Sequence, residues 1–167
     1  MAALPDLQTP DPREPPRSRY LIDCAGAQLR VHAHSLATVL RVDGEIDAFN
    51  ADLVVQAIRR VSRLKAPLIL DLCHLDFLDV AGLRALITLS HENQETNVHC
   101  SVVSGPTLHR LTRVVADHGL PIVDSVPEAL QLVADAVKAR RQFLSRQVRQ
   151  EEPERDTPAT RGIDIPS

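Results

Sequence analysis

Aromatic residues are nearly absent from this chain, which has no Trp, one Tyr and three Phe among 167 residues. A hydrophobic core must therefore consist of Val, Leu, Ile and Ala, and the stacked aromatic surfaces that hold single-stranded nucleic acid are excluded. The chain also lacks an excess of positive charge, with 19 Lys and Arg against 22 Asp and Glu and a formal net charge of −3. This balance argues against binding to duplex nucleic acid. We expect one domain of ordinary size and no nucleic-acid partner.

Long apolar runs are missing as well, because a charge or a His interrupts every hydrophobic segment. None approaches the roughly 18 to 20 residues that cross a bilayer. The first residues carry Asp6, Asp11 and Glu14, where a secretory signal needs a positive end and then an apolar run. The three cysteines form no CxxC pair, which suggests neither a disulfide scaffold nor a zinc finger. We therefore expect no membrane association, no export and a cytoplasmic location.

Proline is concentrated at the two ends of the chain. Eight of the twelve prolines lie in residues 1–20 or 151–167, which otherwise carry charges and small polar residues. We expect a disordered N-terminal tail over residues 1–26 and one domain over 27–140. Residues 141–167 are expected to extend the last helix and then fray into a disordered tail.

The domain begins with two short runs of alternating, β-branched residues at 29–34 and 36–42, which predict an antiparallel hairpin. The period then changes to that of a helix, and Asn50 is suited to cap it. The apolar residues at helical spacing are Leu53, Val54, Ala57, Ile58, Val61 and Leu64.

Strands and helices alternate through the rest of the domain. The run PLILDL after Ala66 is typical of a strand buried on both faces, and a helix is predicted from Val80 to about Asn93. Strands at 98–104 and 121–124 are each followed by helical spacing, and Ser125 with Glu128 forms a capping box. The predicted fold is α/β: a small mixed sheet with an N-terminal antiparallel hairpin and then parallel strands, covered by about four helices.

The most specific segment is LILDLCHLDFLDVAGLRAL at 68–86, a buried strand, a short loop and a helix that starts at Asp79. A second element, DGEID at 43–47, also precedes a helix. Together they resemble the STAS domain, the family of bacterial anti-sigma factor antagonists and of the cytoplasmic tails of sulfate transporters. The likeness runs from about Leu29 to Val137. It implies a STAS-like fold and a regulatory protein-binding module.

The start of the second helix has a physical interpretation beside this resemblance. The Asp79 carboxylate can accept from the free N–H groups near Ala81 and Gly82, and Gly82 would let another surface approach closely. In family members regulated by phosphorylation, the residue before this Gly is Ser or Thr. Here it is Ala81, preceded by Val80, so we expect no phosphorylation at the family position.

The expected partner-binding site lies at this helix start. We expect contacts from Asp79, Val80, Ala81 and Gly82; Leu83 fits docking and internal packing equally well. By resemblance, the strand-to-helix turn that holds three acidic residues should lie nearby: Asp43, Glu45 and Asp47. Asp47 could equally be only a cap of the first helix.

The resemblance implies an anti-sigma factor antagonist that sequesters a serine-kinase-like anti-sigma factor and releases a sigma factor. The alternative is a scaffold or sensory STAS subunit of a larger signalling assembly. The sequence leaves open whether the chain forms a homodimer. Since it has neither a GxSxG nucleophile elbow nor a GxxxxGK[ST] phosphate loop, we expect no enzymatic activity and no cofactor.

A pair of histidines and a pair of cysteines are two further candidate sites, for a metal ion and for a disulfide. His32 and His34 have the spacing of two metal ligands on one strand face, but without a third ligand we expect no metal site. Cys73 and Cys100 lie on neighbouring predicted strands. Parallel alignment brings Cys73 near Val103 or Ser104 and offsets Cys100 by about three residues, roughly 10 Å, which is too far for a disulfide.

Overall fold

The computed structural model describes residues 19–150, and the chain divides into two compact units after Ala134. The elements, in chain order, are β1 (Arg19–Asp23), β2 (Ala27–Ala33), β3 (Thr38–Ile46), α1 (Ala51–Ser62), β4 (Leu68–Asp71), β5 (Leu75–Leu78), α2 (Val80–Glu95), β6 (Cys100–Val103), α3 (Pro106–Thr112), β7 (Ile122–Val123) and α4 (Val126–Gln150). The first unit contains every strand and the start of α4. The described part of the second unit is the remainder of α4, where residues 138–149 are exposed.

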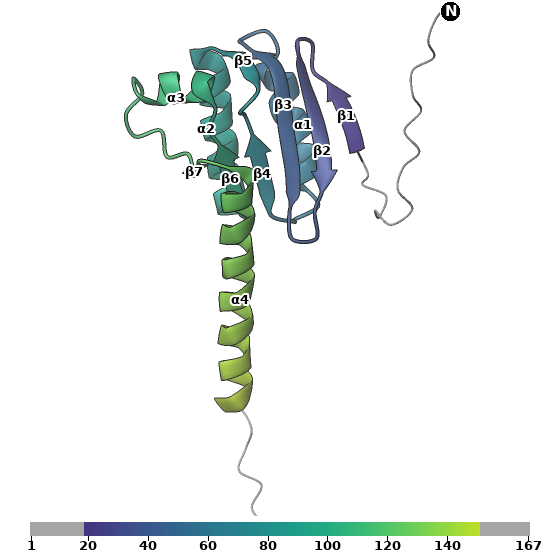
Figure 1. The fold of residues 1–167 in the computed structure, drawn as a ribbon, viewed down its shortest axis with the longest axis vertical. Helices are drawn as coiled ribbons and strands as arrows, with labels where there is room; N and C mark the ends of the chain where they lie inside the picture. Colours follow the sequence, from purple (N-terminus) through teal and green to yellow (C-terminus); the bar gives the residue numbers. More distant parts are fainter. Residues whose placement is uncertain (1–18, 151–167) are drawn as a thin grey trace, which may run out of the picture. The chain divides into compact units, whose positions relative to one another are not determined.

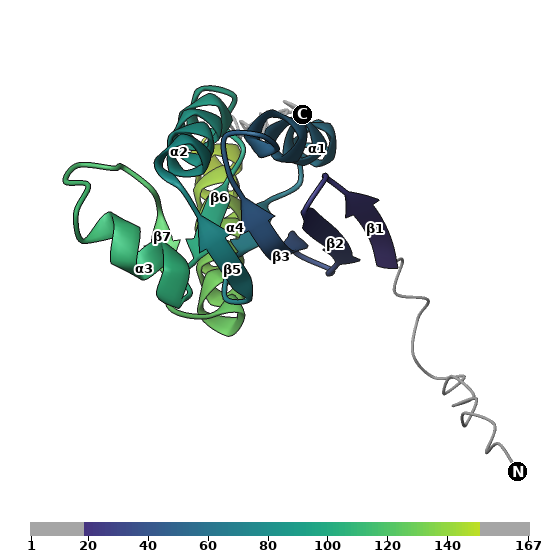
Figure 2. The same cartoon turned by 90° about the horizontal axis from the view of Figure 1, so that it is seen from above.

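One seven-stranded mixed sheet organises the first unit. Its order is β1-β2-β3-β4-β6-β7, and β5 pairs with β3 beyond the end of β4 (Figures 1 and 2). The pairs β1/β2 and β2/β3 are antiparallel, whereas β3/β4, β4/β6, β6/β7 and β3/β5 are parallel. The predicted α/β fold, with its hairpin followed by parallel strands and four helices, is confirmed.

Two strands, β1 and β5, were not expected from the sequence. β1 lies in residues 19–26, which were assigned to the N-terminal tail, so the ordered domain begins earlier than residue 27. Composition could not separate this five-residue strand from the proline-rich segment before it, because β1 depends on pairing with β2. β5 was taken as loop for a similar reason, since its pairing partner β3 lies about 30 residues earlier. Residues 1–18 and 151–167, which hold the rest of the expected tails, lie outside the described residues.

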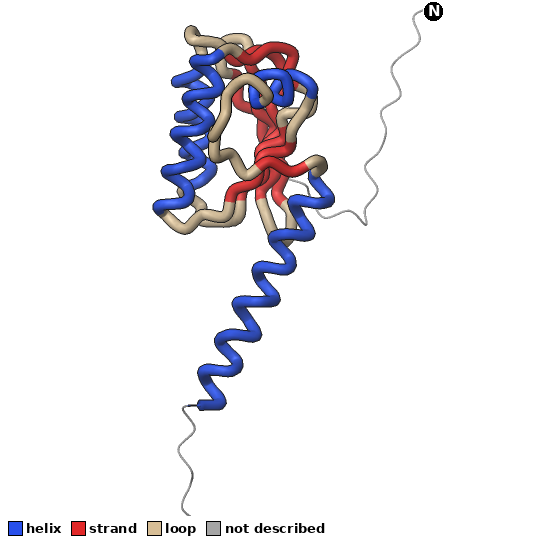
Figure 3. The backbone as a smooth tube through the Cα atoms, turned by 90° about the vertical axis from the view of Figure 1, so that its left-hand side faces the viewer, coloured by secondary structure: helices blue, strands red, loops and turns tan. Residues whose placement is uncertain are grey.

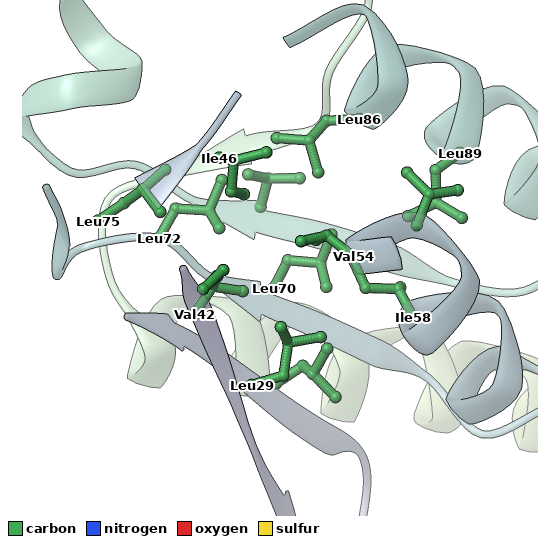
Figure 4. Packing of buried hydrophobic residues seen from close by; sticks show 14 of the residues in the cluster. Leu29, Val42, Ile46, Val54, Ile58, Leu70, Leu72, Leu75, Leu86 and Leu89 are labelled. Atoms are coloured by element: carbon green, nitrogen blue, oxygen red, sulfur yellow. The ribbon is translucent and has the colours of Figure 1, made fainter. Parts of the chain in front are cut away.

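The hydrophobic core lies between the sheet and the helix pair α1 and α2 (Figure 3). Alternate residues of the central strands point toward these helices, among them Val42 and Leu70, and meet Val54, Ile58 and Leu86 (Figure 4). The intervening residues of the same strands face the opposite side. There Val39, Ile69 and Val103 are buried, as are Ala129 and Val133 in the first turns of α4. As the composition required, no aromatic side chain contributes to the buried core.

Of the helix caps predicted from the sequence, the one at α4 is present and the one at Asn50 is not. Ser125 accepts a hydrogen bond from the backbone N–H of Glu128 (3.2 Å), and the Glu128 carboxylate accepts from the N–H of Asp124 (2.9 Å). The predicted capping box at α4 is thus present, except that the Glu128 carboxylate accepts from the N–H of Asp124 and not from that of Ser125. Asn50 makes no capping bond to α1, and its side chain has a different role, described below. No helix within residues 19–150 is long and apolar enough to cross a bilayer.

Candidate functional site

Asp79 joins two segments that are far apart in the sequence. It is the N-cap of α2, where its Oδ1 accepts from the N–H of Gly82 (2.7 Å), as the sequence predicted. Its Oδ2 accepts from the N–H of Ala48 (3.0 Å), and its own N–H donates to the carbonyl of Ile46 (3.1 Å). The helix start and the β3–α1 loop are therefore one hydrogen-bonded unit.

The β3–α1 loop is held by two polar side chains. Asp47 Oδ1 accepts from the N–H groups of Phe49 (2.8 Å) and Asn50 (3.2 Å), which makes Asp47 the residue that organises the start of α1. Asn50 is only 1% exposed. Its Oδ1 accepts from Asp47 N–H (3.0 Å), and its Nδ2 donates to the carbonyls of Glu45 (2.8 Å) and Ala25 (3.2 Å). The expected cap is instead a buried clamp that ties the β1–β2 turn and the end of β3 to the start of α1.

Asp43 and Glu45 belong to β3, not to the expected strand-to-helix turn. The strand continues past Gly44, whose φ of +96° accompanies a shift of register against β5. Asp43 forms ion pairs with Arg30 (3.1 Å) and Arg41 (2.9 Å). Glu45 is exposed and pairs in register with Phe77 of β5. Of the three acidic residues, Asp47 is thus the one whose loop is bonded directly to Asp79.

Gly82 has a role inside the domain that the sequence did not suggest. It is buried, and a Cβ at this position would lie 2.7 Å from Leu78 Cδ1 and 2.9 Å from Ile46 Cγ2. The close approach that this glycine permits inside the domain is between α2 and the strands. A contact of Gly82 with a partner stays a prediction. Leu83 is 1% exposed, so it packs inside the domain. The sequence had left docking and internal packing equally open for this residue.

Four large apolar side chains in or next to the segments that the Asp79–Ala48 bond joins are exposed to solvent. Their exposed fractions are 85% for Phe49, 46% for Leu53, 48% for Phe77 and 50% for Val80. We call these four residues the apolar patch. Phe49 and Val80 are direct chain neighbours of the two bonded residues, and Ala81 beside Val80 is half-buried. Exposed apolar clusters of this kind mark interaction surfaces.

Val80 was expected from the sequence, whereas the other three members of the patch were not. Leu53 shares the helical spacing of the buried residues of α1 but is exposed, as is Leu64 beyond the end of the helix, at 73%. The available signal was the scarcity of aromatics: of three Phe in the chain, Phe49 and Phe77 each lie within two residues of a recognised motif.

Cys73 and Cys100 lie near opposite ends of β4, as the predicted strand alignment indicated. Cys73 Sγ contacts the Ser104 carbonyl at 3.7 Å, whereas Cys100 pairs with Leu68 at the other end of β4. Burial raises the pKa of both thiols to about 11, and for Cys73 the neighbouring Asp71 adds to the rise. Burial also raises the pKa of Cys24. These shifts keep the thiols protonated and poorly nucleophilic near neutral pH.

The two histidines do not share one strand. His32 lies in β2, but the strand ends at Ala33, and His34 is in the hairpin turn, where its N–H donates to Ala37. Within residues 19–150 no group of three or more His, Cys, Asp or Glu is placed to hold a metal ion.

Comparisons with known proteins agree on one family. A family model described as the STAS domain matches residues 28–129. The chain is 34% identical over 128 residues to osmosensory protein A of Mycobacterium tuberculosis, an alignment that covers 74% of this chain and 81% of that protein. The structure resembles that of an anti-sigma factor antagonist from Mycobacterium paratuberculosis, with 30% identity and a TM-score of 0.58, over 65% of this chain and 94% of the other. It also shares its fold with RsbS of Moorella thermoacetica at 12% identity and a TM-score of 0.55, over 66% and 97% of the two chains.

Proposed function

Because this chain belongs to the STAS domain family, we propose that it is an anti-sigma factor antagonist that binds a serine-kinase-like anti-sigma factor and so releases a sigma factor. The similar mycobacterial protein of 30% identity is named an anti-sigma factor antagonist, and the alignment includes nearly all of that protein. In this proposal the chain is a cytoplasmic regulator of transcription. It acts by binding and not by catalysis.

The observation that carries the proposal is the apolar patch beside the segments that the Asp79–Ala48 bond joins. Phe49 in the β3–α1 loop, Leu53 in α1, Phe77 in β5 and Val80 at the start of α2 expose between 46% and 85% of their surface. The bonds of Asp79 hold the loop and the helix start in place. Aromatic side chains on a rigid frame are typical anchors of protein interfaces, because little conformational entropy is lost when they are covered. We infer that Val80, Ala81 and the patch contact the partner, while Asp79 and Asp47 hold the contact surface in position. Gly82 supports that surface from inside.

The proposed complex is not controlled by a phosphate at the start of α2. Neither Val80 nor Ala81 has a hydroxyl, and the first hydroxyl residue of α2 is Thr88, two turns later. A phosphate at position 81 would bring a charge of about −1.5 to −2 beside apolar Val80 and oppose docking. Without it, capture of the partner depends on the amount of protein or on another signal.

A sensory role is the second candidate, because the relative of 34% identity is named osmosensory protein A. In that case the chain is a scaffold or sensory subunit within a larger assembly. The same patch would then bind another component of that assembly.

The test is to mix the purified protein with each serine-kinase-like anti-sigma factor of its own organism, with ATP, and to record complex formation and intact mass. The antagonist role predicts a complex and no added phosphate. Phe49→Asp and Val80→Asp should each abolish the complex, because they place a charge within the patch. Phe143→Asp is the matched control, since Phe143 is 61% exposed on α4, outside the patch. Absence of any complex would refute the antagonist role and favour the sensory one.

A further inference from the structure

The last part of α4 is strongly basic. Residues 136–150 contain five Lys or Arg and no Asp or Glu, although the whole chain has a formal net charge of −3. Residues 138–149 are exposed, and none of the ion pairs within residues 19–150 involves these cations. This segment of the helix therefore presents its charge to solvent. The cations are Lys138, Arg140, Arg141, Arg146 and Arg149.

Most of this charge lies on one side of the helix. At 3.6 residues per turn, four of the five cations fall within one half of the helix circumference, and Arg140 is the exception. In the structure, Arg141, Arg146 and Arg149 line the same surface depression. We call these three arginines and Lys138 the basic face.

Apolar side chains occupy the other half of the helix. Val137, Leu144 and Val148 fall within about 40° of one another around the helix axis, and Phe143 lies farther along the same half. The side chains of Phe143, Leu144 and Val148 are 61%, 51% and 67% exposed. Residues 136–150 thus form an amphipathic helix whose apolar half is open to solvent.

We propose that residues 136–150 bind along the surface of an anionic lipid bilayer. A helix with a cationic half and an apolar half that contains Phe and Leu lies at the boundary between headgroups and acyl chains. The apolar half then leaves water, while the arginines of the basic face donate paired hydrogen bonds to lipid phosphates. Arg140, within the apolar half, reaches the headgroups through its long side chain.

Charge and apolar surface together select this partner. A second copy of the segment would bring two sets of five cations together with no anion among them, which opposes pairing. Nucleic acid would match the charge but leave the apolar half uncovered. An anionic lipid surface satisfies both halves at once.

This inference departs from the sequence-based expectation of no membrane association. That expectation depended on the lack of a run long enough to cross a bilayer, and a helix that lies along the surface needs no such run. The site is also separate from the apolar patch, and the inference does not depend on the partner bound there. Because the mixing experiment above contains no lipid, Phe143→Asp remains its control.

The expected binding is reversible and depends on salt. Residues 151–156 add four acidic residues and one arginine, so residues 136–156 carry six positive against four negative charges. Each Lys or Arg near an anionic membrane strengthens binding by about fivefold, and salt screens this attraction. The affinity should therefore rise with the fraction of anionic lipid and fall with ionic strength.

Cosedimentation of the full chain with lipid vesicles tests the proposal. Vesicles of equal parts phosphatidylglycerol and phosphatidylcholine should bind the protein, whereas vesicles of phosphatidylcholine alone should not. The triple variant Arg141→Gln, Arg146→Gln and Arg149→Gln should weaken binding about a hundredfold, because it removes three cations of the basic face.

A second triple variant is the matched control. Arg60→Gln, Arg63→Gln and Lys65→Gln remove the same charge from exposed positions in the last turn of α1 and just after it, and should leave vesicle binding nearly unchanged. Leu144→Asp tests the apolar half: it should abolish vesicle binding and leave the far-ultraviolet circular dichroism of the lipid-free protein unchanged.

Three outcomes would overturn the proposal. A wild type that stays in the supernatant with phosphatidylglycerol vesicles would direct the search to an acidic protein groove as the partner of this helix. An equal loss of binding in the control triple variant would show that only the net charge matters. Full binding by Leu144→Asp would show that the apolar half does not enter the lipid.

Discussion

The backbone N–H of Ala48 donates to Oδ2 of Asp79 across 31 positions of sequence, at 3.0 Å. The other carboxylate oxygen of Asp79 caps α2. One side chain therefore determines both where the helix begins and where the β3–α1 loop lies. Phe49 and Val80 are the exposed chain neighbours of the two residues that this bond joins.

Replacing Asp79 should lower stability more than the loss of an ordinary helix cap. Asp79→Ala removes the acceptors of both Gly82 and Ala48, and we expect the free energy of unfolding to fall by about 1 to 3 kcal/mol. Asp79→Asn should cost less, because an amide keeps one acceptor oxygen. Urea unfolding measures both. Asp76→Ala, at an exposed position of β5, is the control, and an equal loss in the control would contradict the role of Asp79.

Gly82→Ala should destabilise the domain directly. The added Cβ meets Leu78 and Ile46 at less than 3.0 Å, and overpacking of this kind costs about 1 to 3 kcal/mol. Thermal unfolding gives the measurement, with Arg84→Ala on the exposed side of α2 as the control. If Gly82→Ala keeps full stability but no longer binds a partner, Gly82 is a contact residue after all.

Ala81→Ser should create a phosphorylation site in the proposed complex. The serine would stand at the position where the family's regulated members carry a hydroxyl, directly before Gly82. Incubation with the serine-kinase-like partner and ATP should add the mass of one phosphate and then release the partner. Ala85→Ser, one helical turn later, is the matched control and should stay unmodified. Equal phosphorylation of both variants would show that the position has no special relation to the kinase.

Alkylation of Cys73 and Cys100 should be slow at neutral pH and should accelerate as the pH rises. With a pKa of about 11, roughly one thiol in a thousand is ionised at pH 8, and the rate should increase about tenfold for each pH unit up to about 10. Mass measurement after timed exposure to iodoacetamide follows each site. The urea-unfolded chain is the reference and should react faster. Rapid modification of the folded protein at pH 7 would contradict the burial of these thiols.

The amino-acid sequence by itself determined the order of most strands and helices, the Asp79 cap and the register that separates Cys73 from Cys100. The order of the elements and the Asp79 cap depend on local periodicity and on a hydrogen bond between residues that are close in the chain. The cysteine register follows from aligning two strands of recognisable pattern in parallel. The alternation of apolar residues in β3 and the helical spacing of Val54 and Ile58 need no knowledge of the rest of the fold.

Only the tertiary structure decided which of these residues are buried and which are exposed. The sequence suggested a partner contact for Gly82, whereas its Cα packs against Ile46 and Leu78, and the helical spacing of Leu53 did not show that α1 leaves it exposed. The sequence suggested that Asn50 caps α1. Its bonds to the carbonyls of Ala25 and Glu45 were not foreseen, because they depend on the folded β1–β2 turn and the end of β3. Ile46 is distant in sequence from Gly82, as Ala25 is from Asn50, so local pattern could not supply these contacts.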